Sequence, residues 1–136
     1  MRDKWSSHDD RDKVSLAPVP ICIIGSKFDA YANNFESAIK KQLCMALRYI
    51  AHANGCDLVF GSVKEKVPSQ LYRALLMSHI FDASASSHMD VNHNNALNVR
   101  ASKDSLGKIE EPEGSMQRRG SVESLWQEQI ERVFQR

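Results

Sequence analysis

Two short apolar runs, each followed by an amphipathic helical pattern, set the fold class of this chain. The run ICII at residues 21–24 follows an extended Ala-Pro-Val-Pro segment, and the run LVF at residues 58–60 is the second. Unbroken apolar runs of this length predict strands buried on both faces, as in parallel sheets. The order strand, helix, strand, helix therefore predicts an α/β domain with a parallel sheet and right-handed crossovers.

Apolar residues repeat every three or four positions in both helical patterns. Asn33, with Glu36 three residues on, is the predicted N-cap of one long helix, and Gly55 is its predicted left-handed C-cap. Pro68 lies in the first turn of the second predicted helix. The apolar stripes are Phe35, Ile39, Leu43, Leu47 and Ile50 in the first helix and Leu71, Leu75, Leu76 and Ile80 in the second.

Composition divides the chain into four predicted segments. Residues 1–16 are a polar lead-in, which we expect to be flexible because it has little apolar area to bury, and residues 17–82 are the α/β unit. Residues 83–120 are a mostly irregular extension with one weak strand candidate at 96–99, and residues 121–136 are an amphipathic helix. Two strands are too few for such a sheet, which usually has about five or six. The others must come from residues absent here or from another chain.

Two loops carry the most specific chemical pattern. Ser26, Lys27 and Asp29 follow the first strand, and Ser62 and Lys64 follow the second. Ligands bind at the carboxyl ends of strands in parallel α/β folds. A Lys-x-Asp there suits guanine, because the carboxylate accepts two hydrogen bonds from the base while the lysine stem lies along the ring. The second loop has the form of the Ser-Ala-Lys loop whose main-chain amide meets the guanine carbonyl.

A structural alternative for these residues stays open. Lys27 and Asp29 can form a surface pair, and Ser62 and Lys64 can cap the next helix. No G-x-x-x-x-G-K-[ST] motif is present, so the chain lacks the glycine-rich loop, lysine and hydroxyl that hold phosphates and Mg²⁺. We therefore expect no GTPase activity and no cofactor in this chain, and GTP or GDP binding only in a longer parent protein. The two loops are predicted to be vestigial guanine-recognition loops.

Charge and cysteine content exclude several other classes. Eighteen Lys and Arg balance seventeen Asp and Glu, which argues against a nucleic-acid partner. No apolar run approaches the length of a membrane span, so we expect no membrane insertion, and the three cysteines fit no disulfide framework. His88, Asp90 and His93 lack a fourth ligand, so no metal site is predicted. Arg118-Arg119-Gly120-Ser121-Val122 has the pattern that basic kinases favour, which makes Ser121 a candidate phosphorylation site as well as a helix N-cap.

The segments APVPICIIGSKFD, FESAIKKQLCMALRYIAHANGCDLVF and GSVKEK resemble the light intermediate chains of cytoplasmic dynein 2. A looser resemblance continues through ALNVRASKDSLGKI and ESLWQEQIERVFQR. Lys103 stands where members of this family usually have an apolar residue. The resemblance implies that residues 17–82 are the C-terminal half of a Ras-like domain of the P-loop NTPase type.

The resemblance also implies a function. It predicts a non-catalytic subunit of the dynein 2 motor that binds the heavy chain and other dynein 2 subunits and supports retrograde intraflagellar transport and cilium assembly. The expected location is the cytoplasm and cytoskeleton, including the axoneme and basal body of the cilium. Two alternatives stay open: a guanine-nucleotide-binding protein whose phosphate loop lies in a missing N-terminal half, and an α/β binding module unrelated to dynein.

Overall fold

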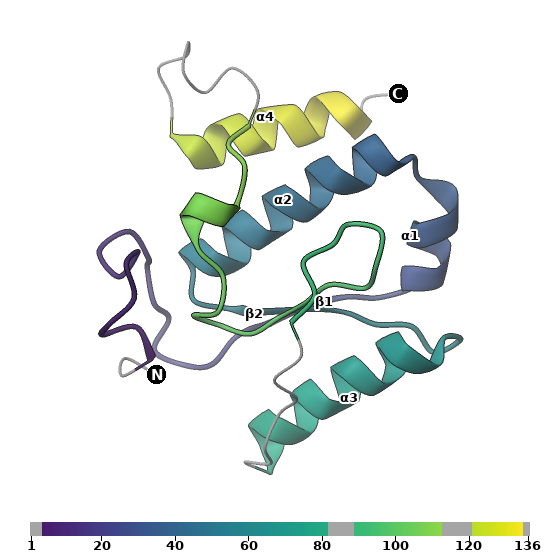
Figure 1. Ribbon diagram of the computed structural model, residues 1–136, viewed down its shortest axis with the longest axis horizontal. Helices are drawn as coiled ribbons and strands as arrows, with labels where there is room; N and C mark the ends of the chain where they lie inside the picture. Colours follow the sequence, from purple (N-terminus) through teal and green to yellow (C-terminus); the bar gives the residue numbers. More distant parts are fainter. Residues whose placement is uncertain (1–3, 82–88, 113–120, 135–136) are drawn as a thin grey trace.

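A computed structural model describes residues 4–81, 89–112 and 121–134 (Figure 1). Its helices and strands alternate in the first half of the chain and are followed by a short strand and two separate helices. In chain order they are β1 (Cys22–Gly25), α1 (Phe28–Asn34), α2 (Ser37–Ala53), β2 (Asp57–Phe60), α3 (Lys66–Ile80), β3 (Asn98–Val99), the 3-10 helix η2 (Leu106–Lys108) and α4 (Val122–Phe134).

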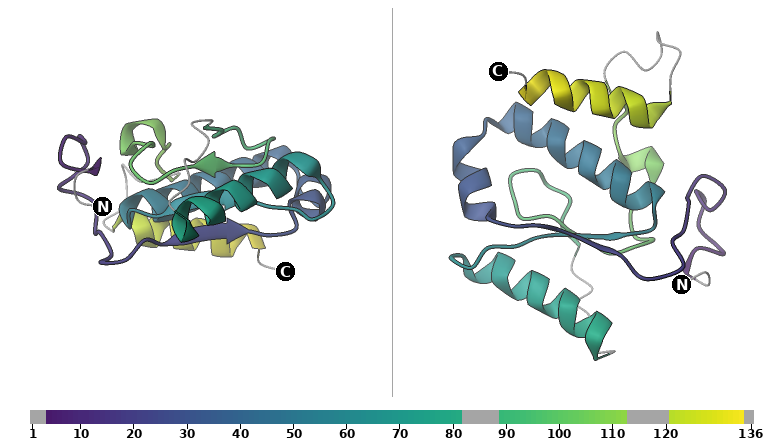
Figure 2. Two further views of the ribbon diagram at one scale, coloured as in Figure 1. Left: turned by 90° about the horizontal axis from the view of Figure 1, so that it is seen from below. Right: turned by 180° about the vertical axis from the view of Figure 1, so that it is seen from behind.

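The sheet has the order β1-β2-β3, with β1 parallel and β3 antiparallel to β2. In Figure 1 the sheet lies between α2 on one face and α3 on the other, and the opposite view in Figure 2 agrees. The predicted α/β class, with a parallel pair of strands and a helix after each, is confirmed. The sheet is not wholly parallel as predicted, because β3 pairs antiparallel to β2. β3 falls at the end of the weak strand candidate at residues 96–99.

The core is built around β2, all four residues of which are buried. Leu58 and Val59 are almost completely enclosed, and Cys44 of α2 and Leu97 are enclosed to a similar degree. β1 differs from its prediction, because it is not buried on both faces and Ile24 is 41% exposed. The physical reason is its position: among the described residues β1 has a neighbouring strand on one side only.

The long helix predicted to start at Asn33 is wrong, because the chain forms two helices there. Asn33 lies in the last turn of α1, where its side-chain amide donates to the main-chain oxygen of Asp29 at 2.7 Å. Phe35 then takes extended dihedral angles (φ −118°, ψ 141°), which breaks the helical path, and Glu36 occupies the N-cap of α2. Gly55, with φ of +66°, follows the end of α2 in the left-handed conformation that was predicted.

The N-terminal segment packs against the C-terminal end of α2, although the sequence predicts a flexible lead-in. Trp5 is 2% exposed, and its ring lies 5.1 Å from the ring of His52. The main-chain amide of Ser15 donates to the oxygen of Ala53 at 2.8 Å. The lead-in that the sequence predicts therefore contributes one large aromatic side chain to the interior. The sequence did not predict the burial of Trp5, because its neighbours in the chain are polar and its packing partners lie far along the chain.

The last helix, α4, lies beside α2 (Figure 1). Leu125 and Trp126 are its buried residues, and the ring of Phe134 meets that of Phe35 edge-on at 5.9 Å. Ser121 is the N-cap, as predicted, because its hydroxyl accepts a hydrogen bond from the amide of Ser124 at 3.2 Å. Among the described residues, no helix has both the length and the apolar content needed to cross a bilayer.

Candidate functional site

The five residues predicted to form guanine-recognition loops lie around one hollow at the carboxyl ends of β1 and β2. The hollow has a volume of about 580 Å³ and is lined by Ser26, Lys27, Asp29, Ser62 and Lys64, together with the apolar side chains of Ile24 and Tyr72. The two loops are held together through the main chain. The amide of Gly61 donates to the oxygen of Gly25 at 2.8 Å, and the amide of Phe28 donates to the oxygen of Gly61 at 3.1 Å.

Gly25 is required by the close approach of this loop to the next strand. A Cβ atom at Gly25 would lie 2.5 Å from the Phe60 ring, so a larger residue would push the ring or the loop aside. Lys27, two residues on, is one of two non-glycine residues with positive φ in the described part of the chain, at 55°. This conformation turns the chain from β1 into α1 and places Asp29 in the first turn of that helix.

Asp29 joins the two loops through its carboxylate. The Ser62 hydroxyl donates to Oδ1 of Asp29 at 2.7 Å, and Nζ of Lys64 lies 3.5 Å from Oδ2. The hydrogen bond from Ser62, with a smaller contribution from the charge of Lys64, lowers the pKa of Asp29 below its usual value. Asp29 is therefore ionised at neutral pH, and both of its oxygens act as hydrogen-bond acceptors.

Ser62 is not the helix cap that the alternative interpretation predicted, because Glu65 occupies the N-cap of α3 without a side-chain cap hydrogen bond, but Ser62 does order the loop before that helix. Its oxygen accepts hydrogen bonds from the amides of Lys64 at 3.1 Å and Glu65 at 3.3 Å, immediately before α3. That alternative also paired Asp29 with Lys27. In the structure Asp29 instead contacts Ser62 and Lys64, both in the second loop. A wall of apolar side chains beside an acceptor carboxylate suits a flat ring that carries N–H donors on one edge.

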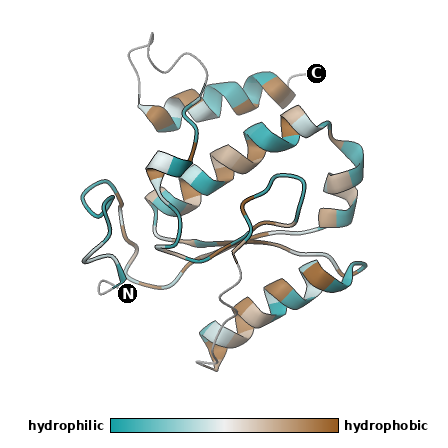
Figure 3. Cartoon of the chain, viewed as in Figure 1, coloured by the Kyte–Doolittle hydropathy of each residue, from teal (hydrophilic) through white to brown (hydrophobic). Residues whose placement is uncertain are grey.

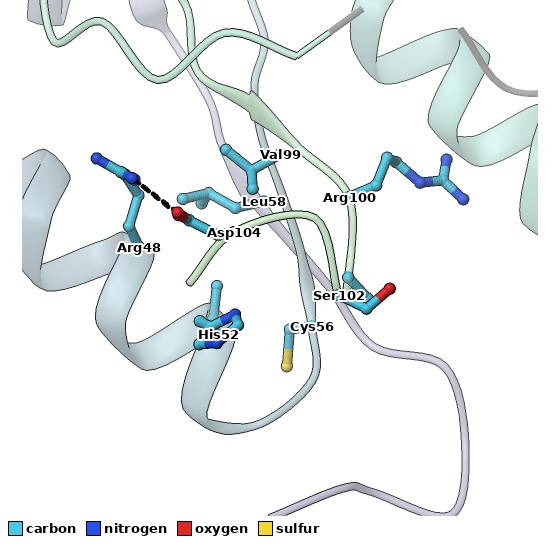
Figure 4. A pocket seen from close by; sticks show the side chains of 10 residues that line it. Arg48, His52, Cys56, Leu58, Val99, Arg100, Ser102 and Asp104 are labelled. Atoms are coloured by element: carbon cyan, nitrogen blue, oxygen red, sulfur yellow. Dashed lines mark hydrogen bonds and ion pairs between the residues drawn. The ribbon is translucent and has the colours of Figure 1, made fainter. Parts of the chain in front are cut away.

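A second group of polar residues, which the sequence did not single out, lies near the C-terminal end of α2. The guanidinium of Arg48 donates two hydrogen bonds of 2.8 Å to the carboxylate of Asp104, and each side chain is 3% exposed. Figure 4 shows this pair with the side chain of His52 nearby. These three residues are among those that line a cavity of about 10 Å³. That volume holds at most one water, so the cavity is not a ligand site. Arg48 and Asp104 are far apart in the sequence, and no local pattern marks either one.

His88 and Arg118 to Gly120 lie outside the described residues. His93 is described, and its Nε2 lies 3.0 Å from the hydroxyl of Ser37, at the start of α2. Asp90 pairs with Asn98 in a backbone bridge, and its carboxylate accepts hydrogen bonds from Asn92 and Asn95. The structure therefore gives His93 and Asp90 separate hydrogen-bond partners.

Comparison with known proteins supports the resemblance carried by the strand-end loops. No family model matches the chain. It is 32% identical over 145 residues to cytoplasmic dynein 2 light intermediate chain 1 of Bos taurus, covering 98% of this chain and 40% of that protein. The human protein of the same name gives the same values, and the Danio rerio protein is 31% identical over 92% of this chain and 36% of its own length. The chain is related to the dynein 2 light intermediate chains. The α/β module unrelated to dynein is therefore excluded.

The relation to dynein 2 light intermediate chains covers nearly the whole of this chain, which spans about two fifths of the length of those relatives. A solved structure of the dynein light intermediate chain's conserved domain matches the fold with a TM-score of 0.50 and 17% identity, over 86% of this chain and 40% of that one. This chain therefore shares the fold of that conserved domain over the matched residues.

Proposed function

We propose that this chain acts as part of a light intermediate chain of cytoplasmic dynein 2. In this role it binds the dynein 2 heavy chain and other dynein 2 subunits, and it supports retrograde intraflagellar transport and cilium assembly. The location that follows is the cytoplasm and cytoskeleton, including the axoneme and basal body. One observation carries the proposal: 32% identity to cytoplasmic dynein 2 light intermediate chains over 98% of this chain.

We also propose that residues 17–82 are the C-terminal half of a Ras-like domain. β1 and β2 are then two neighbouring parallel strands of a larger sheet, and a further strand pairs with β1. Ile21, just before β1, and Ile24, within it, support this, because they are 40% and 41% exposed and β1 has only one neighbouring strand among the described residues. Parallel sheets are normally covered on both faces and have more strands. Residues 1–16, 83–120 and 121–136 remain a lead-in, an extension and an amphipathic helix in this division.

The exposed side of α3 is the best candidate contact for another subunit. Val67, Met77 and Ile80 are each about half exposed or more, and Phe81 directly after the helix is 67% exposed. Figure 3 shows that apolar (brown) and polar stretches both occur along α3. Exposed apolar patches of this kind mark interaction sites in soluble proteins.

Co-purification tests the subunit role. The tagged chain, expressed in ciliated cells of its own source, is expected to bring down the dynein 2 heavy chain. The variant Ile80→Glu is expected to weaken this association, whereas Arg132→Glu on the exposed side of α4 serves as the matched control and is expected to retain it. Failure of the unmodified chain to bring down the heavy chain, in cells where a full-length light intermediate chain does so, would refute the proposed role.

We propose that the chain has no GTPase activity, since it encodes no phosphate-binding loop. A second function, guanine-nucleotide binding without hydrolysis, is favoured by the hollow that holds Asp29 between two loops. Fluorescent GTP or GDP titration tests it, with Asp29→Asn as the variant and Asp12→Asn, which changes an exposed carboxylate elsewhere, as the control. Saturable binding that only Asp29→Asn removes supports nucleotide binding, and equal titration curves for all three proteins contradict it.

We further propose that Ser121 accepts a phosphate from a kinase that recognises the two preceding arginines. The residue is exposed at the N-cap of α4, where added negative charge stabilises a helix. Incubation with a basic-directed kinase and ATP, followed by mass spectrometry, is expected to find one phosphate that Ser121→Ala removes. Unmodified Ser121 after complete phosphorylation of a control peptide would count against it.

A further inference from the structure

Two histidines and a carboxylate from distant parts of the chain meet near the C-terminal end of α2. One oxygen of Asp10 lies 2.9 Å from Nε2 of His52 and 3.9 Å from Nδ1 of His8. The ligand atoms of these three residues all lie within 4.8 Å of one another. The side chains of Asp10 and His52 are 9% and 2% exposed, and that of His8 is 14% exposed. The cluster is therefore compact and largely shielded from solvent, and His8 is its most exposed member.

The hydrogen bonds of His8 fix which of its nitrogens carries a proton. Nε2 lies 2.9 Å from the main-chain oxygen of Asp104, which can only accept, so Nε2 donates. Nδ1 accepts a hydrogen bond from the main-chain amide of Asp10 at 3.1 Å, so Nδ1 has no proton. The lone pair of the neutral ring is thus on the side of Asp10. Metal-bound histidines commonly have this arrangement, in which the outer nitrogen donates to a carbonyl. To coordinate an ion, Nδ1 of His8 exchanges its hydrogen bond from the amide of Asp10 for the bond to the metal.

The charge of Asp10 is not balanced by a neighbouring Lys or Arg in the described part of the chain. Its donors are Nε2 of His52 and the main-chain amide of Leu106, each at 2.9 Å. The nearby guanidinium of Arg48 is already committed to Asp104 by two hydrogen bonds. Both of these donors bond to the same oxygen of the carboxylate. A buried carboxylate is costly without a cation, and the cluster needs either a proton or a metal ion.

We propose that Nδ1 of His8, the carboxylate of Asp10 and Nε2 of His52 bind a divalent transition-metal ion, for which zinc is the best match. Imidazole and carboxylate ligands suit zinc, and tetrahedral bonds of about 2.0–2.1 Å place ligand atoms about 3.3 Å apart. The measured separations of 2.9 and 3.9 Å lie on either side of that value. In the metal-bound form the ring proton of His52 lies on Nδ1, which leaves the lone pair of Nε2 for the ion, and water completes the coordination.

The second cluster of similar composition does not have the same property. Cys22, Asp57 and His79 also lie within 4.8 Å of one another. However, Nε of Arg100 lies 3.1 Å from Oδ1 of Asp57, and the amide of Ala101 donates to the same oxygen at 2.6 Å. A guanidinium therefore already supplies the cation at this cluster. His79 is for this reason a matched control for His8.

The proposed ion joins three segments that are otherwise held by packing and hydrogen bonds. It links the N-terminal segment through His8 and Asp10 to α2 through His52, with Leu106, the first residue of η2, as an outer partner. The ring of Trp5 lies 4.8 Å from that of His8 and 5.1 Å from that of His52. Indole fluorescence therefore reports on events at the site.

Zinc titration of the full 136-residue chain, stripped with chelator at pH 7.5, tests the proposal. Calorimetry is expected to give one equivalent of zinc, accompanied by a change in indole emission. His8→Gln, which removes the most accessible ligand, is expected to weaken binding by at least about 10–100-fold, the loss that even an outer-shell change causes. His79→Ala is expected to bind like the unmodified chain. Circular dichroism of each variant confirms that the fold is kept, and Co²⁺ absorption provides an independent measure of tetrahedral binding.

Three results would overturn the proposal. The first is the absence of a saturable zinc equivalent in the unmodified chain. The second is unchanged affinity in His8→Gln, because the ion would then be bound elsewhere. The third is equal loss in His8→Gln and His79→Ala, which would assign the ion to no particular cluster.

Discussion

The buried ion pair between Arg48 and Asp104 gives the sharpest stability prediction for this fold. Both side chains are 3% exposed, and two hydrogen bonds of 2.8 Å join them. Replacing Asp104 by alanine leaves the guanidinium of Arg48 buried without its counter-charge. Breaking a buried pair in this way typically costs about 3–5 kcal/mol. Because a domain of this size is stable by about 5–15 kcal/mol, we expect Asp104→Ala to remove about a fifth or more of the total.

Urea unfolding followed by indole fluorescence measures this loss. With a denaturant slope of about 2 kcal/mol per molar, a loss of about 3–5 kcal/mol lowers the urea midpoint by about 1.5–2.5 M. Lys41→Ala is the matched control, because Lys41 joins the same helix to Glu110 at 2.9 Å with side chains that are 44% and 62% exposed. An exposed pair of this kind contributes only about 0–1 kcal/mol.

A double variant separates the cost of an unpaired charge from the value of the pair itself. We expect Arg48→Met combined with Asp104→Leu to be much less destabilising than Asp104→Ala alone, since both charges are removed together. The reasoning is refuted if Asp104→Ala unfolds at the same urea concentration as Lys41→Ala. It is also refuted if the double variant is as unstable as the single one, because the loss would then come from packing.

Three further predictions follow from single residues. Gly55→Ala is expected to lower the thermal midpoint, because a residue held at φ of +66° costs about 1–3 kcal/mol and the new Cβ would lie 2.5 Å from Leu16; an unchanged midpoint would contradict it. The pKa of Asp10 is lowered from 3.8, so its ionised carboxyl stabilises the fold above that pH, and this contribution is lost as the pH falls below it. Between pH 6 and pH 3 the urea midpoint of the unmodified chain should therefore fall more than that of Asp10→Asn. Ile24→Lys is expected to reduce self-association through β1 in sedimentation experiments, and equal sedimentation of both proteins would argue against an exposed edge.

The elements that the sequence predicts are those with a local cause. The apolar run at residues 58–60 becomes β2, Gly55 takes the left-handed conformation, and Ser121 caps α4. Each depends on chemistry within a few residues. Phe35 shows where the same reasoning fails, since its apolar character continues the helical pattern while its backbone is extended and divides α1 from α2. Periodicity indicates which side chains face the core, but it does not detect a single residue that leaves the helical path.

The contacts that the sequence could not predict join residues far apart in the chain. His8 reaches the carbonyl of Asp104, and Asp10 reaches both His52 and the amide of Leu106. A short polar segment with one tryptophan has too little apolar area to order itself, so its composition indicates a lead-in. It becomes ordered because α2 and the segment before η2 supply partners. Only the assembled fold contains that information.

The strand-end loops illustrate why a recognition motif and a structural motif are difficult to separate in this chain. Ser62 accepts two main-chain hydrogen bonds before α3 and at the same time donates to Asp29. These bonds join the loops after β1 and β2 whether or not a base occupies the hollow. Removing the Asp29 side chain would therefore weaken the loops themselves, and loss of nucleotide binding would not identify a direct contact. Asparagine keeps an oxygen for Ser62 while it removes the charge and one acceptor, so Asp29→Asn changes base recognition more than loop structure.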